Sequence, residues 1–149
     1  MNTLTKDKLQ NLSDFSGSAC VSIFIPTHRK GKEVHELKDS RVLKNHYQDI
    51  KNTLKDNKGI PENEAIAYLE PVHKLILDRE FWHHQTEGLA IFLGDNFFEY
   101  FHLPYHVDEY SSLENSFFLM PLVSVFSDDN RYFILSLGLN KTRLMEATR

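Results

Sequence analysis

Cysteine is almost missing from this sequence, since Cys20 is the only one among 149 residues. A single cysteine excludes an internal disulfide, and a reducing, cytoplasmic location is the default expectation for such a chain. No apolar run approaches the roughly 20 residues that a membrane-spanning helix needs. Residues 1–10 hold two lysines without an apolar segment behind them, so they predict no secretory signal. These absences favour a globular protein with no membrane partner.

The sequence also lacks the common catalytic motifs. The Gly31-Lys32 pair has no earlier glycine at the spacing of a phosphate-binding loop. The residue four positions after His35 is Asp39 and not histidine, so the zinc-protease pattern fails as well. There is no Gly-x-Ser-x-Gly for an esterase nucleophile. We therefore expect no enzymatic activity and no cofactor.

Charge is unevenly distributed along a chain of otherwise average composition. Apolar residues make up 41% and charged residues 26%, which is typical of a globular protein. Residues 27–58 carry nine Lys/Arg against five Asp/Glu, whereas residues 59–149 carry six against fourteen. The whole-chain charge of −4 therefore hides a basic segment that is followed by an acidic one.

Apolar periodicity predicts an α+β fold that tends towards α/β, with helices on both faces of a central mixed sheet of about four to five strands. Alternation predicts strands over 19–26, 88–93 and 97–103, the last two joined by a tight turn at 94–96. Helical spacing predicts helices over 36–56 and 61–78. Pro71 lies inside the second helix and should kink or split it.

The strand over 19–26 is expected to be internal, because both of its faces are largely apolar. One face holds Val21, Ile23 and Ile25, and the other holds Cys20, Ser22 and Phe24. Cys20 is accordingly interpreted as a small core residue.

Smaller elements complete the prediction. Thr5 is the expected N-cap of a short first helix. The 79–87 segment is expected to be a loop, whose Phe81 and Trp82 anchor a helix end against the sheet. A polar loop is predicted over 105–115. The 116–126 segment is ambiguous between a strand and a helical turn at Pro121.

The last segment predicts further strands over 131–137 and 142–147. We place a first domain at 1–130 and the start of a second at 131–149, so that domains beyond this sequence would be its partners in the same chain. Such an exposed strand edge could also pair with a second copy to give a homodimer.

Histidine is abundant, with eight residues, but its spacing argues against a metal site. His83 and His84 are adjacent, so their side chains should diverge. His102 and His106 flank a proline and could converge. A zinc site needs more ligands than either pair supplies, so no metal is expected. A metal-dependent hydrolase built on these histidines is the weakest of the hypotheses.

The positive signal is a basic cluster that follows the 19–26 strand. Such a cluster is suited to binding phosphate, although an ordinary solvated helix face would look the same. Expected acids nearby are Glu33 and Glu36. The candidate nucleic-acid-binding residues are His28, Arg29, Lys30, Lys32, Lys38, Arg41 and Lys44.

Several segments together give the sequence a resemblance to the bacterial archaeo-eukaryotic release factor family. They are SIFIPT at 22–27, LKN at 43–45, the FW-HQ-EGLAIF pattern at 81–92, and PLVSVF followed by RYFILSL towards the end. The resemblance covers about residues 4–149. It implies the first domain of a three-domain protein whose second domain begins near Arg131.

The family's prototypes read a stop codon through an NIKS and a YxCxxxF motif, and neither is present here. Their Gly-Gly-Gln hydrolysis motif has no counterpart, because this sequence contains no Gly-Gly. The resemblance therefore implies a non-catalytic recognition domain whose partner is the ribosome or structured RNA. The alternative is a protein-interaction or scaffold domain without a nucleic-acid role, which would need an exposed apolar patch.

Overall fold

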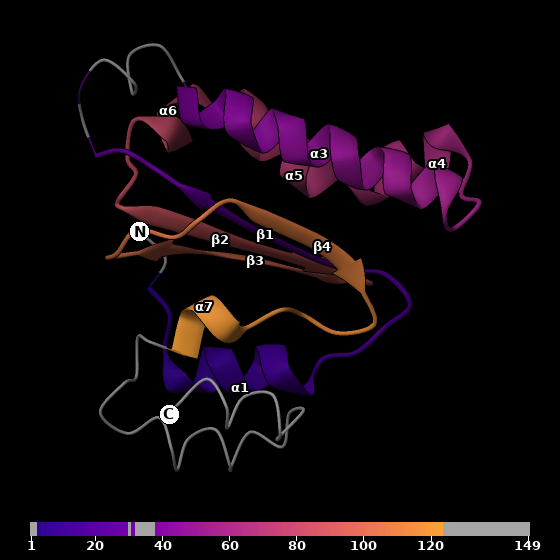
Figure 1. Cartoon of the computed structure of the whole chain (residues 1–149), viewed down its shortest axis with the longest axis horizontal. Coiled ribbons are helices and arrows are strands. Elements are labelled where there is room, and N and C mark those ends of the chain that lie inside the picture. The colour runs from indigo at the N-terminus through magenta and orange to yellow at the C-terminus, as the bar shows by residue number, and fades with distance from the viewer. Residues whose placement is uncertain (1–2, 30, 32–37, 124–149) are drawn as a thin grey trace.

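The computed structural model describes residues 3–29, 31 and 38–123. Its helices and strands are arranged in three layers, with the sheet in the middle (Figure 1). In chain order the elements are α1 (Lys6–Asp14), β1 (Cys20–Pro26), α3 (Lys38–Asp56), α4 (Glu62–Tyr68), α5 (Glu70–Leu77), α6 (Arg79–Trp82), β2 (Gly88–Gly94), β3 (Phe97–Leu103), β4 (Tyr110–Glu114) and α7 (Met120–Val123).

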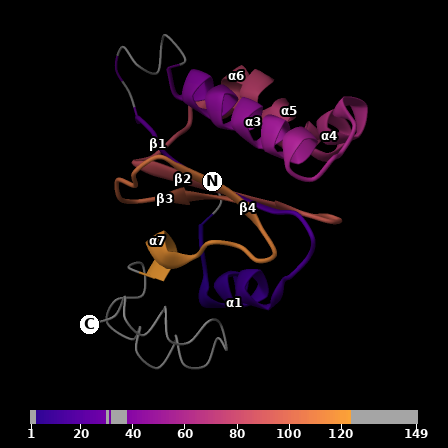
Figure 2. The same ribbon diagram turned by 45° about the vertical axis from the view of Figure 1, so that its right-hand side comes forward.

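Helices cover both faces of the sheet, as the sequence predicts. The helices α3 to α6 lie on one face, and α1 and α7 lie on the other (Figures 1 and 2). The α+β fold class is thereby confirmed. The predicted mixed sheet is wrong, because the described strands form a four-stranded sheet in the order β3-β2-β1-β4 whose neighbours are all antiparallel.

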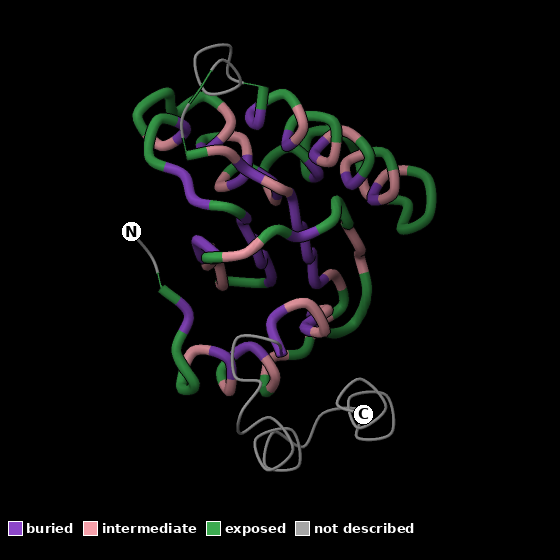
Figure 3. The backbone as a smooth tube through the Cα atoms, turned by 60° about the vertical axis from the view of Figure 1, so that its left-hand side comes forward, coloured by how far each residue is buried: buried purple, intermediate pink, exposed green. Residues whose placement is uncertain are grey.

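The central strand β1 has the two apolar faces that its sequence predicts. Val21 and Ile23 are 0% and 1% exposed and pack with α3 and α5. Cys20 and Phe24, which point the other way, pack with α1 and α7 in a second core cluster. Figure 3 shows this burial in the middle of the fold, where β1 and β2 are almost wholly buried. The sheet is thus a shared wall between two apolar cores, which explains why both faces of β1 are apolar.

Local sequence signals explain where the helices begin and break. The Thr5 hydroxyl accepts a hydrogen bond from the backbone N–H of Lys8 at 3.2 Å, which confirms the predicted N-cap of α1. The predicted 61–78 helix is split at Leu69 into α4 and α5, and Pro71 lies in the first turn of α5. Proline is tolerated there because the N–H groups of a first turn need no helical partner.

Two loop predictions are wrong in part. The expected polar loop over 105–115 contains β4, which pairs antiparallel with β1 so that Phe24 lies opposite Tyr110. The expected loop over 79–87 begins with the short helix α6. The anchoring role of its aromatic residues is confirmed, since Trp82 is buried and the Phe81 ring lies 5.1 Å from that of Tyr100.

Within the ambiguous 116–126 segment, α7 forms a helical turn that contains Pro121. The predicted strands over 131–137 and 142–147, the second domain and the strand edge for a homodimer lie outside the described residues. Within residues 3–29, 31 and 38–123, none of the helices has the length and apolar character of a membrane-spanning segment.

Candidate nucleic-acid interface

The base of the candidate site is a rigid junction at the end of β1. The backbone N–H of Thr27 donates to the Glu87 carbonyl at 3.1 Å, and its hydroxyl donates to the Thr86 carbonyl at 2.7 Å. The Thr86 hydroxyl in turn donates to the Leu103 carbonyl at 2.8 Å. Both threonines are buried. The ends of β1 and β3 and the approach to β2 are thereby joined, so the chain leaves the sheet from a fixed point.

His28 is tied to the first described turn of α3 by Asp39. One carboxylate oxygen of Asp39 accepts the His28 backbone N–H at 2.9 Å, and the other lies 2.8 Å from His28 Nδ1. Asp39 is only 5% exposed, and a buried carboxylate needs such partners. Because an ionised carboxylate only accepts, Nδ1 donates in this pair. The pair fixes the approach of the basic segment to α3.

The charge of Arg29 is partly neutralised by an acid that lies far from it in the sequence. Its Nε atom lies 3.1 Å from a carboxylate oxygen of Glu87, just before β2. Both side chains are about half exposed, and exposed pairs of this kind contribute about 0–1 kcal/mol. The expected neighbours Glu33 and Glu36 lie outside the described residues. Among the described acids, Asp39 contacts His28 and Glu87 contacts Arg29.

Three exposed cations of α3 have no ion pair with a described residue. Lys38, Arg41 and Lys44 are all exposed, and their spacing of three residues places them on neighbouring turns. None of them forms an ion pair with another residue in the described part of the chain. We call these three residues the basic row. The candidates Lys30 and Lys32 lie outside the described residues.

The two later cations of α3 each lie beside another side chain. Lys55 lies 2.8 Å from Glu62, and this hydrogen bond raises the pKa of the lysine and lowers that of the glutamate. The Lys51 ammonium lies 5.9 Å from the centre of the Tyr47 ring. Within α3, the exposed cations that have no ion pair with a described residue are thus those of its N-terminal half, directly above the end of β1 (Figure 1).

The described histidines do not gather into a metal centre. His84 is paired with Glu80 at 2.9 Å, and His106 lies 3.4 Å from Asp108. The His102 ring is buried beside that of Phe81, 5.7 Å away. Across the described ranges, no group of three or more possible ligands comes together.

Cys20 is a core residue, as the sequence predicts. It is fully buried, and burial is the main cause that raises the pKa of its thiol. A thiol whose pKa is raised is a weak nucleophile.

An open cleft at the opposite end of the sheet is the feature that sequence reasoning missed. It lies between the α4–α5 junction and the β2–β3 turn, and has a volume of about 480 Å³. Its walls come from residues about 25 positions apart, so periodicity carries no signal for it.

No protein-family model matches the chain, and no curated protein matches it significantly. The resemblance to release factors therefore stays a prediction.

Proposed function

We propose that this chain is the non-catalytic N-terminal recognition domain of a bacterial release-factor-like protein. It acts in the cytoplasm on the ribosome or structured RNA, in translation termination or ribosome rescue. The observation that carries this proposal is the basic row, where three exposed cations lack an acidic partner among the described residues. Continuation into further domains, and pairing of a 131–147 edge in a homodimer, remain predictions.

The chemistry of the basic row suits phosphate recognition by charge. Lysine and arginine side chains on neighbouring helical turns can each contact a separate phosphate. Such contacts position a protein on RNA without reading its bases. Because the whole chain is negative at −4, binding would depend on this local surface and would be sensitive to salt.

A salt titration tests the proposal directly. We would replace Lys38, Arg41 and Lys44 together by glutamine and measure binding to ribosomes and to a structured RNA at several salt concentrations. Each lost phosphate contact should lower the slope of log K against log salt by about 0.7–0.9, so the triple variant should lose about 2–3 in total. The matched control removes the same charge from exposed lysines on other parts of the fold, namely Lys6, Lys58 and Lys74.

Arg29 gives a second, more selective test. Because Glu87 holds its guanidinium, Arg29→Gln should weaken RNA binding less than Arg41→Gln. Glu87→Gln should strengthen binding, since it releases the arginine and removes a negative charge. Equal affinity and equal salt slope for the wild type and the triple variant would contradict the proposal and favour the protein-interaction alternative.

A further inference from the structure

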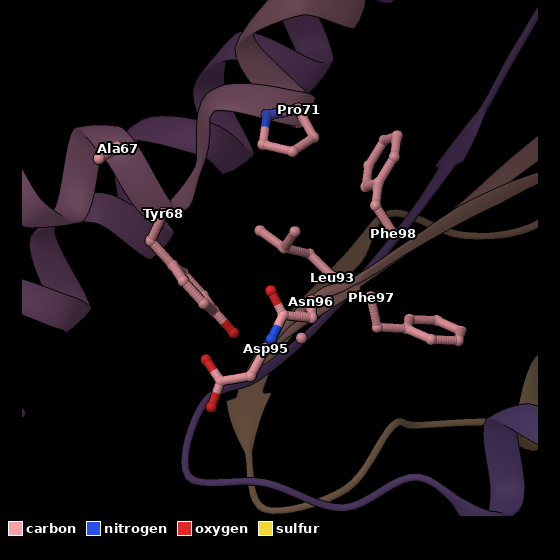
Figure 4. A pocket seen from close by; sticks show the side chains of 9 residues that line it. Ala67, Tyr68, Pro71, Leu93, Asp95, Asn96, Phe97 and Phe98 are labelled. Carbon is pink, nitrogen blue, oxygen red and sulfur yellow. The ribbon is translucent and has the colours of Figure 1, made fainter.

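The cleft at the far end of the sheet combines apolar walls with a single carboxylate. Figure 4 shows Tyr68 reaching from the α4 side towards Asp95, with Pro71 also on the helical side and Phe98 on the strand side. The volume of about 480 Å³ is within the usual range of ligand sites. The residues that line it are Ala67, Tyr68, Pro71, Leu93, Gly94, Asp95, Asn96, Phe97 and Phe98.

The walls of the cleft are fixed by the fold. The Tyr68 hydroxyl donates to the backbone carbonyl of Ala19, just before β1. On the opposite wall, Gly94 pairs with Phe97, which leaves a two-residue turn. Within that turn Asn96 has a φ of 55°, a left-handed conformation that asparagine tolerates well. The cleft is therefore formed before any ligand arrives.

The Asp95 carboxylate is available to a ligand. It forms no hydrogen bond or ion pair with any other described residue, and the Tyr68 hydroxyl hydrogen is already donated to Ala19. The charge of Asp95 nevertheless affects two titratable groups nearby. Burial is the largest cause that raises the pKa of Tyr68 to about 12, and the Asp95 charge is the second. The same charge also raises the pKa of the Cys20 thiol.

The ligand chemistry follows from these groups. None of the lining residues is Lys, Arg or His, so a phosphate or nucleotide would meet only negative charge. A cation on an apolar stem would instead bury its methylenes against Pro71 and Leu93, and its head group would reach Asp95. The rings of Tyr68 and Phe98 add favourable surfaces for a cation.

We infer that this acidic aromatic cleft receives a lysine or arginine side chain of a partner protein. The inference goes beyond the proposed RNA recognition and does not depend on it, because the basic row and the cleft lie at opposite ends of β1 (Figure 1).

A two-dimensional NMR titration of the 149-residue chain tests the inference. The probe is the peptide Ac-Gly-Arg-Gly-NH₂, with Ac-Gly-Gln-Gly-NH₂ and AMP as comparisons. We expect saturable shifts at the backbone amides of 67–70 and 93–98 with the arginine peptide only. Asp95→Asn should weaken binding about tenfold, because it removes the charge-assisted hydrogen bond. Phe98→Leu should weaken it by a smaller factor.

Two controls separate this inference from general charge effects and from the proposed RNA recognition. Asp108→Asn removes another exposed carboxylate and should leave peptide binding unchanged. The glutamine triple variant of the basic row should also bind the peptide with unchanged affinity, even if its affinity for RNA is lost. The inference is overturned if the arginine peptide gives no saturable shifts, if AMP or the glutamine peptide binds equally well, or if Asp95→Asn has no effect.

Discussion

The buried carboxylate of Asp39 should be worth far more stability than an exposed aspartate on the same helix. Asp39→Ala removes two hydrogen bonds, at 2.9 Å to the His28 backbone and 2.8 Å to its ring. Hydrogen bonds to charged groups contribute about 1.5–3 kcal/mol each. Part of this is offset because the carboxylate no longer has to be buried. We expect a net loss of about 2–3 kcal/mol, or about 5–10 °C in Tm for a chain of this size.

Urea unfolding measures this loss with an intrinsic reporter. Trp82 is the only tryptophan of the chain and is 2% exposed, so its fluorescence should change when the core opens. The matched control is Asp49→Ala, an exposed aspartate on α3, for which we expect a change within about 0.5 kcal/mol. Asp39→Asn should fall between the two, because its carbonyl oxygen can still accept the His28 backbone N–H.

The result that refutes this reasoning is a similar stability for Asp39→Ala and Asp49→Ala. In that case the carboxylate would not hold the segment that leads from β1 to α3. A loss of stability for Asp39→Ala with unchanged RNA affinity would show that the His28 anchor is structural and that the basic row acts without it.

Three further predictions concern stability. Gly94→Ala should cost about 1–3 kcal/mol in chemical unfolding, because the added Cβ would collide with the Phe15 ring. Trp82→Phe should cost about 1–3 kcal/mol by calorimetry, because it leaves the Leu75 carbonyl without the indole N–H that donates to it at 2.7 Å. Burial and Asp95 raise the pKa of Tyr68 from about 10 to about 12, so its contribution to stability is complete below pH 10 and is lost between pH 10 and 12. In Tyr68→Phe this alkaline decline should become shallower, and an unchanged decline would contradict the assignment.

Much of the fold could be predicted because local patterns and burial agree. The two faces of β1 follow from the alternation of large apolar residues, and the split between α4 and α5 follows from Pro71. The strand β4 could not be predicted, because its sequence YSSLE is short and mostly polar. It forms because the backbone of β1 offers a hydrogen-bonding edge, and a polar sequence is common in short edge strands.

The candidate site could be predicted only in part. Helical spacing correctly places Arg41 and Lys44 on neighbouring turns of α3. The partner of Arg29 could not be predicted, since Glu87 is 58 positions away and comes close only through the pairing of β1 with β2. The cleft around Asp95 could not be predicted from the sequence for the same reason, because its two walls meet only in the folded chain.

The strand β1 is fastened to the helical layer at both ends. At one end His28 is held by Asp39 of α3, and at the other the carbonyl of Ala19 accepts the hydroxyl of Tyr68. Neither helix can lift away from the sheet without breaking one of these bonds and exposing the core beneath it. Amide hydrogen exchange should therefore find β1 and α3 opening as one cooperative unit, with similar free energies, whereas α1 on the far side of the sheet can exchange separately.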